Sequence, residues 1–253
     1  MRVYVINLDR HPQRMARMSS LLCGVDFERV CATDGKDLAG PEVRYGSAPR
    51  RFEGLTRYER ACTRSHAAAW QRLLDSGASH GCILEDDVIL SPDFPAFVAD
   101  AAWIPADCDV LKIETFLQPL LIKKRCRLPV RNRWVTLLLS THYGAAGYIL
   151  NRRAATVLVK HGMRPPRPVD HMLFDVPSLF RALRIRQLLP ALCLQTRHVR
   201  NGPDFPELAS AIQLLPEMSP HRWVDALWRF VGLLLSVASG KAFVARREIV
   251  PFH

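Results

Sequence analysis

Stretches with strand-like and helix-like spacing of apolar residues alternate along most of the chain. RVYVINL, from Arg2 onward, is apolar and β-branched, which predicts a buried strand, and the next stretch has apolar residues at helical spacing. FERVCATDG predicts a second strand that ends in an Asp-Gly turn. A helix is expected from Thr56 to Ser76, with Gly77 as its stop, followed by a strand within GCILEDDVIL.

The alternation continues in the second half of the chain. A short helix is expected after Ser91, a buried strand in CDVLKIET, and a hairpin or a loop over residues 122–135. GAAGYIL predicts a strand, followed by a helix with Asn151 as its N-cap. This alternation predicts an α/β fold with a mostly parallel central sheet, which we divide into a domain at residues 1–205 and a helical C-terminal extension at residues 206–253.

The predicted extension contains an apolar run, Phe230 to Ser239, that is about half a membrane span long. Basic residues bound the run, and Trp223 and Trp228 precede it. This composition predicts an interfacial helix on the cytoplasmic face of a membrane. A helix that packs in the core or forms a dimer is the alternative.

The net charge of +11 favours acidic partners such as nucleotides, phosphorylated glycans, anionic lipids or nucleic acid. Much of this charge lies in one short segment with six basic residues: Lys123, Lys124, Arg125, Arg127, Arg131 and Arg133. Only Trp134 supplies an aromatic ring there, and no nucleic-acid motif accompanies the segment. We therefore expect a phosphorylated glycan or a membrane surface as its partner, or a solvated loop, and no nucleic acid.

The seven cysteines are scattered, odd in number and without a CxxC pair. This pattern argues against a disulfide framework or a structural zinc site and predicts a reducing cytoplasm. The N-terminal stretch has a polar break at Asn7 and lacks the apolar core of a signal peptide. No stretch reaches the roughly 18 uninterrupted apolar residues of a membrane span.

Three adjacent acids, Glu85, Asp86 and Asp87, interrupt the apolar strand pattern. A carboxylate in a dry strand is costly unless it is paired or binds a metal, so we expect the strand to end at Leu84 or Glu85. Alternation would place Glu85 and Asp87 on one side and Asp86 on the other. Two such carboxylates can share a hard cation such as Mg²⁺ or Mn²⁺, and a strand-end turn paired with basic residues is the alternative.

Five stretches carry a resemblance to a known family. They are VYVINLDRHPQRM, ATDG, ACTRSHAAAWQRLLDSGASHGCILEDDV, HYGAAGYILNRRAA and PVDHMLFD, and they span about residues 3–175. Together and in this order they resemble glycosyltransferase family 25, the lipopolysaccharide and lipooligosaccharide glycosyltransferases, which also include collagen galactosyltransferases. Arg64 departs from the family pattern, where an apolar residue commonly precedes the Ser-His pair.

The resemblance implies a GT-A-like, Rossmann-type nucleotide-sugar-binding fold and transfer of a sugar, commonly galactose, from a UDP-sugar with Mn²⁺ or Mg²⁺. It makes the acidic triplet the counterpart of the family's DxD motif. Asp87 is then expected to bind the metal directly, and Glu85 or Asp86 completes the contact. The metal would bridge the two phosphates and stabilise the charge on the departing UDP.

On the same reading, four residues after the first strand would lie near the nucleotide: Asn7, Asp9, Arg10 and Arg14. Arg10 and Arg14 are four residues apart, so we expect them on one helix face, where they meet phosphate or, for Arg14, simply solvent. Asp34 would bond the ribose or the uracil, or make a plain turn. Ser65 and His66 are expected against the donor site.

The stretch PVDHMLFD supplies the expected base. Asp170 follows a rigid proline-rich segment and is expected to act as the general base on the acceptor hydroxyl, with a helix N-cap as the structural alternative. His171 is a competing base or a further metal ligand. Gly144 and Gly147 would let the backbone approach the donor sugar, or mark a strand bend.

The resulting hypothesis is an inverting, metal-dependent galactosyltransferase that uses UDP-galactose and a lipid-linked or core oligosaccharide acceptor. It would be cytoplasmic and peripheral on the inner membrane. One alternative keeps the fold and metal but uses UDP-glucose or a UDP-N-acetylhexosamine. Others are a non-catalytic glycan- or membrane-binding relative, and a nucleotide phosphohydrolase that needs no acceptor.

Overall fold

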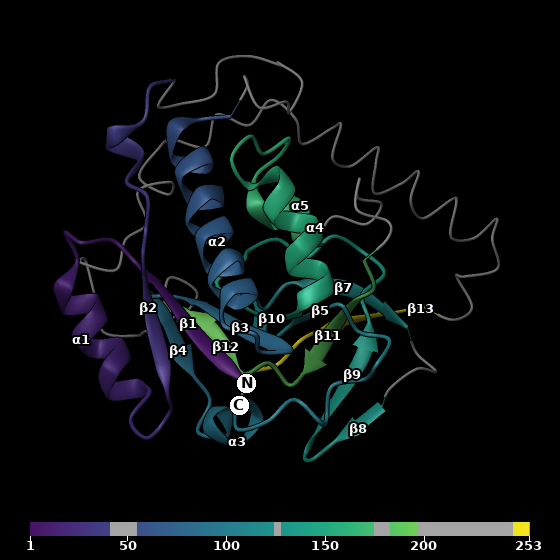
Figure 1. Cartoon of the computed structure of the whole chain (residues 1–253). Helices are drawn as coiled ribbons and strands as arrows, with labels where there is room; N and C mark the ends of the chain where they lie inside the picture. Colours follow the sequence, from purple (N-terminus) through teal and green to yellow (C-terminus); the bar gives the residue numbers. More distant parts are fainter. Residues whose placement is uncertain (41–54, 124–127, 175–182, 197–244, 253) are drawn as a thin grey trace.

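The computed structural model describes residues 1–40, 55–123, 128–174, 183–196 and 245–252. An eight-stranded sheet with the order β2-β1-β3-β10-β5-β11-β9-β8 forms the centre of the molecule (Figure 1). Its strands, in chain order, are β1 (Arg2–Asn7), β2 (Phe27–Cys31), β3 (His80–Glu85), β5 (Val110–Lys112), β8 (Leu128–Val130), β9 (Arg133–Leu137), β10 (Gly147–Asn151) and β11 (Ile185–Leu189).

The strand directions correct one expectation. The α/β class is confirmed, but the sheet is mixed: β1 runs parallel to β2 and β3, and β5 to β11, whereas the other neighbouring pairs are antiparallel. A parallel neighbour requires a crossover connection, usually a helix. The described residues between β5 and β10 form strands and loops without a helix, so β10 runs back between β3 and β5.

Helices cover both faces of the sheet (Figure 1). One face packs against α2 (Arg57–Asp75), α4 (Arg152–Gly162) and α5 (Val169–Phe174), and the other against α1 (Pro12–Leu21) and α3 (Phe94–Val98). The strand alternation of β1 divides its side chains between the two cores. Tyr4 and Ile6 pack with the α2 side, while Val3 and Val5 pack with the α1 side.

Helix α2 begins where the sequence predicts. The Thr56 side chain accepts from Glu59 N at 3.1 Å, and the Glu59 carboxylate accepts from Thr56 N at 2.9 Å, which forms a reciprocal capping box. The helix ends before Gly77, which has a φ of 73°. Asn151 caps α4 as expected, since its side chain accepts from Ala154 N at 2.8 Å.

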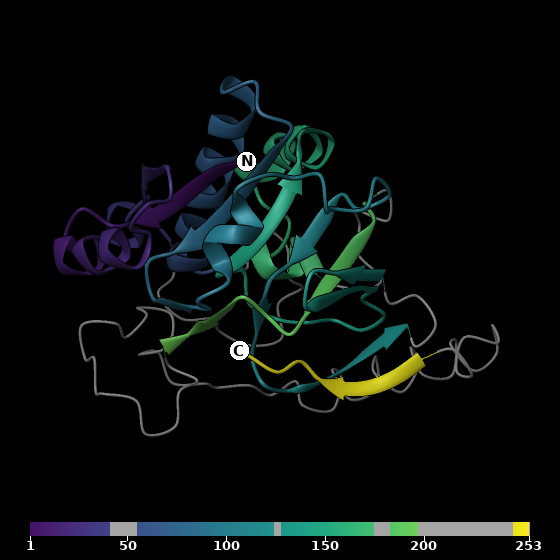
Figure 2. The same ribbon diagram turned by 90° about the horizontal axis from the view of Figure 1, so that it is seen from below.

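Two smaller sheets complete the described fold. Strands β4 (Val88–Leu90), β12 (Cys193–Gln195) and β6 (Glu114–Thr115) form a three-stranded sheet in the order β4-β12-β6. Strand β7 (Pro119–Lys123) pairs antiparallel with β13 (Ala245–Ile249), and Figure 2 shows this pair along the lower side of the molecule. A short 3-10 helix, Gly35–Asp37, follows β2.

Strand β13 corrects the expectation of a helical extension for residues 245–249. These residues pair with β7, and the neighbouring Val250 is fully buried in the core on the α2 side. The division at residues 205 and 206 and the apolar run Phe230 to Ser239 lie outside the described residues, so they stay predictions. None of the helices in the described parts of the chain is long and apolar enough to cross a membrane.

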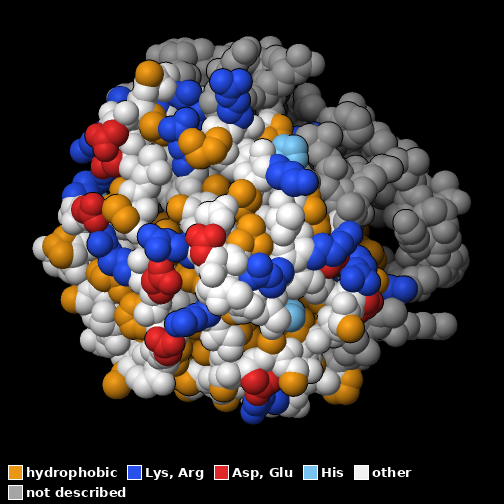
Figure 3. Space-filling view, in the orientation of Figure 1, with side chains coloured by type: hydrophobic (Ala, Val, Ile, Leu, Met, Phe, Trp, Pro, Cys, Tyr) orange, Lys and Arg blue, Asp and Glu red, His pale blue; other side chains and the backbone are white. Residues whose placement is uncertain are grey.

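The basic segment is partly structural. Strands β8 and β9 form the expected hairpin, but Arg133 is only 2% exposed, and its guanidinium pairs with Asp93 at 2.9 Å and donates to Ser91 and Ala191. Arg133 therefore does not contribute to a surface patch, and residues 124–127 lie outside the described part. On the face drawn in Figure 3, basic side chains are dispersed, with acidic side chains between them.

Candidate active site

Strand β3 delivers the acidic triplet to the carboxyl edge of the sheet. The strand ends at Glu85, and Asp86 and Asp87 form the turn before β4. Asp86 contacts side chains of β1 and α1, whereas Glu85 and Asp87 both contact β12. The predicted strand end and the predicted split of the three acids are confirmed.

Asp86 has charged and polar partners. Asn7 Nδ2 donates to its Oδ2 at 2.7 Å, and Arg14 donates to its Oδ1 at 3.2 Å. Burial raises the pKa of Asp86, while the hydrogen bond from Asn7 and the Arg14 charge oppose that rise. Asp86 thereby joins β1 and α1 to the acidic turn.

The structure separates Arg10 from Arg14. Helix α1 begins at Pro12, so Arg10 precedes the helix, and the expected shared helix face is wrong. Arg10 forms an ion pair with Asp34, whose side chain also accepts from Lys36 N at 2.9 Å and caps the 3-10 helix. Arg14 instead points to the acidic turn.

Asp9 and Ser65 also have local partners. Asp9 is exposed and pairs with Arg29, whose Nε donates to Asn7 Oδ1 at 2.9 Å. The hydrogen bond from Arg29 lowers the pKa of Asp9. Ser65 is buried, and its hydroxyl accepts from Thr33 N at 2.9 Å, which ties α2 to the segment after β2. Contacts of these residues with a nucleotide stay predictions.

Glu85 and Asp87 are held by a neutral amide. Gln195 Nε2 lies 3.2 Å from Glu85 Oε2 and 3.2 Å from each oxygen of Asp87. An amide nitrogen carries two hydrogens, so these three carboxylate oxygens share two donors. Burial, together with the charges of Glu85 and Asp86, raises the pKa of Asp87 to about 7.

The other oxygen of Glu85 ends a hydrogen-bonded chain from the core. Trp70 Nε1 donates to the Tyr148 hydroxyl at 2.7 Å, which contacts His66 Nδ1 at 2.8 Å. His66 Nε2 lies 3.1 Å from Glu85 Oε1. Because a carboxylate only accepts hydrogen bonds, His66 Nε2 donates to Glu85, and this tautomer leaves Nδ1 to accept from the Tyr148 hydroxyl.

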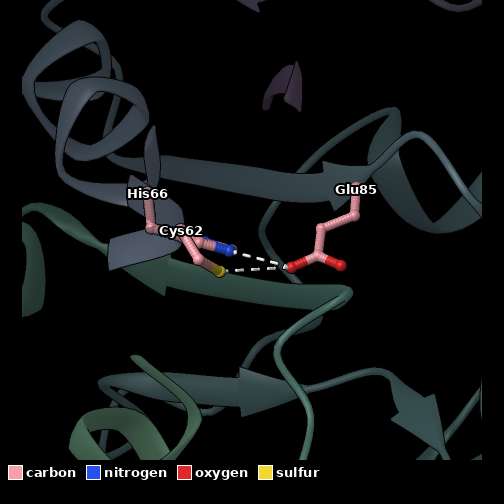
Figure 4. A group of neighbouring side chains, drawn as sticks. All are labelled: Cys62, His66 and Glu85. Atoms are coloured by element: carbon pink, nitrogen blue, oxygen red, sulfur yellow. Dashed lines mark hydrogen bonds and ion pairs between the residues drawn. The ribbon is translucent and has the colours of Figure 1, made fainter. Parts of the chain in front are cut away.

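Glu85 belongs to two groups of side chains that could hold a metal ion, one with Cys62 and His66 and the other with Asp87. Cys62 and His66, one helical turn apart on α2, point to its carboxylate, and the three ligand atoms lie within 4.8 Å of one another (Figure 4). Both ring nitrogens of His66 already have hydrogen-bond partners, so this set acts as a hydrogen-bond network. Glu85, which is partly exposed, and the buried Asp87 offer the oxygens that Mg²⁺ and Mn²⁺ prefer. The residues present therefore fit such a cation.

Asp170 lies beside a loop that a buried ion pair supports. Its Oδ2 accepts from Gly144 N at 3.2 Å, and its charge, like that of Glu85, raises the pKa of the Cys62 thiol, where burial is the largest cause. Lys112 Nζ donates to the carbonyls of Tyr143 and Gly144 and to Glu114 Oε2, and Glu114 also accepts from Ala146 N.

The Lys112–Glu114 pair is fully buried. Burial lowers the pKa of Lys112 and raises that of Glu114 to about 7, and each residue's charge opposes the shift of the other. Next to Asp170, the His171 ring packs against Tyr143 with centroids 5.0 Å apart. Asp170 lies in the first turn of α5, so the ion pair, the loop and this helix together orient its carboxylate.

Packing accounts for the two glycines. Gly144 has a φ of 84°, and a Cβ there would lie 2.2 Å from the Phe116 ring. A Cβ on Gly147 would lie 2.0 Å from Cys193 Sγ. Donor contacts of these glycines stay predictions.

The sequence reasoning missed several residues of the site. Lys112, at the end of β5, and Glu114, at the start of β6, stand two apart in an apolar stretch of sequence, and this was an available signal because buried charged residues are usually paired. Tyr148 and Trp70 look like ordinary core residues in the sequence. Gln195 has no local signal at all.

The family's sequence model, described as "Glycosyltransferase family 25 (LPS biosynthesis protein)", matches residues 1–173. The chain belongs to this family. Family 25 membership confirms the resemblance and makes the chain a glycosyltransferase by family.

Relatives of the chain include "Lacto-N-neotetraose biosynthesis glycosyltransferase LgtB" of Neisseria gonorrhoeae, 34% identical over 81% of this chain and 77% of the relative. "Lipooligosaccharide biosynthesis protein lic2B" of Haemophilus influenzae is 34% identical over 79% of each chain. Among solved structures, a glycosyltransferase involved in the glycosylation of the major capsid of PBCV-1 has a TM-score of 0.41 and 8% identity, covering 77% of this chain and 93% of its own.

Proposed function

We propose that the chain transfers galactose from UDP-galactose to a lipopolysaccharide- or lipooligosaccharide-type glycan, with inversion at the anomeric carbon and with Mn²⁺ or Mg²⁺. The observation that carries this proposal is the arrangement of Glu85 and Asp87 in a family 25 chain, where three carboxylate oxygens, two of them on the buried Asp87, share one amide group. The names of relatives such as LgtB and lic2B support the acceptor class.

Glu85 and Asp87 would hold the cation, which supplies positive charge to the diphosphate leaving group. Asp86, tied to Asn7 and Arg14, fixes the turn that carries these two ligands. The donor nucleotide would lie at the carboxyl edge of β1 and β3, near the pair of Arg10 and Asp34. Here the ends of two parallel strands meet the segment that follows β2.

Asp170 is the proposed general base. Gly144 N and His171 N both donate to its carboxylate, which holds it in one orientation for taking the proton of the acceptor hydroxyl. His171, packed on Tyr143, is the competing base. The basic character of the chain and residues 206–253 would keep the enzyme on the cytoplasmic face of the inner membrane, where the proposed lipid-linked acceptor would lie.

The test is release of UDP from a panel of UDP-sugars, with Mn²⁺ or with chelator, and with or without truncated core oligosaccharide. We expect release to be greatest with UDP-galactose and to need both cation and acceptor. A preference for UDP-glucose or a UDP-N-acetylhexosamine would overturn the donor assignment alone. Release without acceptor would indicate a phosphohydrolase, and no turnover of any UDP-sugar would indicate a non-catalytic binding protein.

A further inference from the structure

Gln195 lies opposite the acidic turn because of strand pairing. It is the last residue of β12 and pairs with Val88 of β4, the residue that follows Asp87. The backbone repeats this connection, since Thr196 N donates to the Asp87 carbonyl at 2.9 Å. Gln195 is 5% exposed, so its amide occupies a defined place beside the two carboxylates.

The two ends of the Gln195 amide are used unequally. Nε2 faces three carboxylate oxygens of Glu85 and Asp87, each 3.2 Å away. Oε1 is buried and has no hydrogen-bond partner among the described residues. A buried acceptor without a donor is costly, and buried side-chain polar atoms are rarely left in this condition. A hydrogen bond to the acids therefore explains only one end of this side chain.

We infer that Gln195 is a further oxygen ligand of the divalent cation held by Glu85 and Asp87, and that a half-turn of its amide brings Oε1 to the place of Nε2. This inference rests on the proposed function, because it adds a ligand to the cation site proposed there. An amide oxygen is a hard, neutral ligand of the kind that Mg²⁺ and Mn²⁺ accept.

The distances agree with a shared coordination shell. After the half-turn, Oε1 would lie about 3.2 Å from the oxygens of Glu85 and Asp87, where Nε2 lies now. Neighbouring oxygens of an octahedral shell with metal–oxygen bonds of about 2.1 Å are about 3.0 Å apart. Oxygens this close repel one another without a cation between them, so the amide presents NH₂ to the bare carboxylates and its oxygen to the cation.

The test is a titration of the full chain with Mn²⁺ in the absence of nucleotide. The electron paramagnetic resonance signal of free Mn²⁺ measures how much of the ion remains unbound. Gln195→Met keeps a similar length but has no amide oxygen. We expect it to weaken Mn²⁺ binding about tenfold or more. If Gln195 only bridges the two acids, its loss frees them, and binding that is unchanged or tighter would overturn the inference.

Gln187→Met is the matched control. Gln187 is fully buried on β11, and its amide is satisfied at both ends: Oε1 contacts His142 Nδ1 at 2.9 Å, and Nε2 donates to backbone carbonyls. This variant should keep the wild-type affinity for Mn²⁺. Should Gln195→Met not fold, Gln195→Asn decides, because the shorter amide still forms hydrogen bonds but does not reach the cation and is expected to weaken binding as well.

The wild-type titration separates the two proposals. Absence of Mn²⁺ and Mg²⁺ binding by the wild type would overturn the cation site of the proposed function. Wild-type binding together with undiminished binding by Gln195→Met would overturn only the role of Gln195.

Discussion

Asp86 and Asp87 are adjacent in the chain and similarly buried, yet their surroundings differ in charge. Asp86 meets the Arg14 guanidinium and the Asn7 amide. Among the described residues, the hydrogen bonds to the carboxylates of Asp87 and Glu85, on the other side of the turn, come from Gln195, His66 and the Cys62 thiol, while the Arg14 and Arg17 charges also act on Asp87. One side is a closed structural ion pair, and the other carries negative charge that a ligand can neutralise.

This difference distinguishes an acid that stabilises the fold from acids that can bind a ligand. A buried charge that meets its counter-charge within the protein stabilises one arrangement of the chain and attracts little else. A carboxylate whose hydrogen bonds come from amide, imidazole and thiol groups still favours a cation, because uncharged donors do not cancel its field. The Lys112–Glu114 pair repeats the first case beneath the loop that contacts Asp170.

The largest expected contrast comes from Asp87→Asn and Asp86→Asn measured in parallel. Asp87→Asn should lower sugar transfer by at least about 100-fold while the protein stays folded, because a ligand of the cation is lost. Asp86→Asn should reduce transfer by the folded enzyme far less, and it should change the free energy of unfolding only modestly, since the lost bond to Arg14 is offset by removal of a charge that burial disfavours. The measurements are UDP release and urea unfolding.

Equal losses of activity in the two variants would contradict this contrast and assign the cation to all three acids. Normal activity of Asp87→Asn would move the cation site away from this turn. Circular dichroism of both variants provides the control for folding.

Local patterns predicted much of this arrangement. Alternation placed Asp86 opposite Glu85 and Asp87, and the predicted limits of α2 agree with its capping box and Gly77. These features depend on residues within a few positions of one another. The periodicity of a strand and the capping of a helix are set by that neighbourhood.

The missed features depend on distant pairings. Gln195 meets Glu85 across 110 positions, and the direction of β10 depends on the route of the chain after β5. Arg10 was misplaced for a local reason, since Pro12 opens α1 and leaves Arg10 outside it. Nothing in the sequence around Gln195 distinguishes it from other glutamines, because its role comes entirely from the strand beside it.

A smaller contrast is expected in the pH dependence of stability. Burial and the charges of Glu85 and Asp86 raise the pKa of Asp87 from 3.8 to about 7. The folded protein therefore holds this proton more tightly than the unfolded chain, and the resulting stability is lost as the pH rises from about 4 to about 7. With chelator present, Asp87→Asn should exceed the wild type in unfolding free energy by on the order of 2 kcal/mol at pH 8.5, and by much less at pH 5.

Urea unfolding of both proteins at the two pH values checks this expectation. Asp86→Asn is the comparison variant: burial also raises the pKa of Asp86, but the bonds from Asn7 and Arg14 oppose that rise, so its gain at pH 8.5 should be smaller than that of Asp87→Asn. A gain for Asp87→Asn that is the same at pH 5 and pH 8.5 would contradict the raised pKa.

The smallest expected effect concerns the series of hydrogen bonds from Trp70 through Tyr148 and His66 that orients Glu85. Tyr148→Phe removes the hydroxyl between Trp70 and His66, so the His66 ring is no longer held with its Nε2 proton toward Glu85. We expect kcat to fall about tenfold at saturating Mn²⁺. Trp70→Phe is the matched variant, because it removes the donor to Tyr148 and leaves the Tyr148–His66 bond. Both variants should have a lower free energy of unfolding, but only Tyr148→Phe should have a lower kcat. Equal kcat values for Tyr148→Phe and Trp70→Phe would show that these hydrogen bonds only stabilise the fold and that Glu85 keeps its orientation through Gln195.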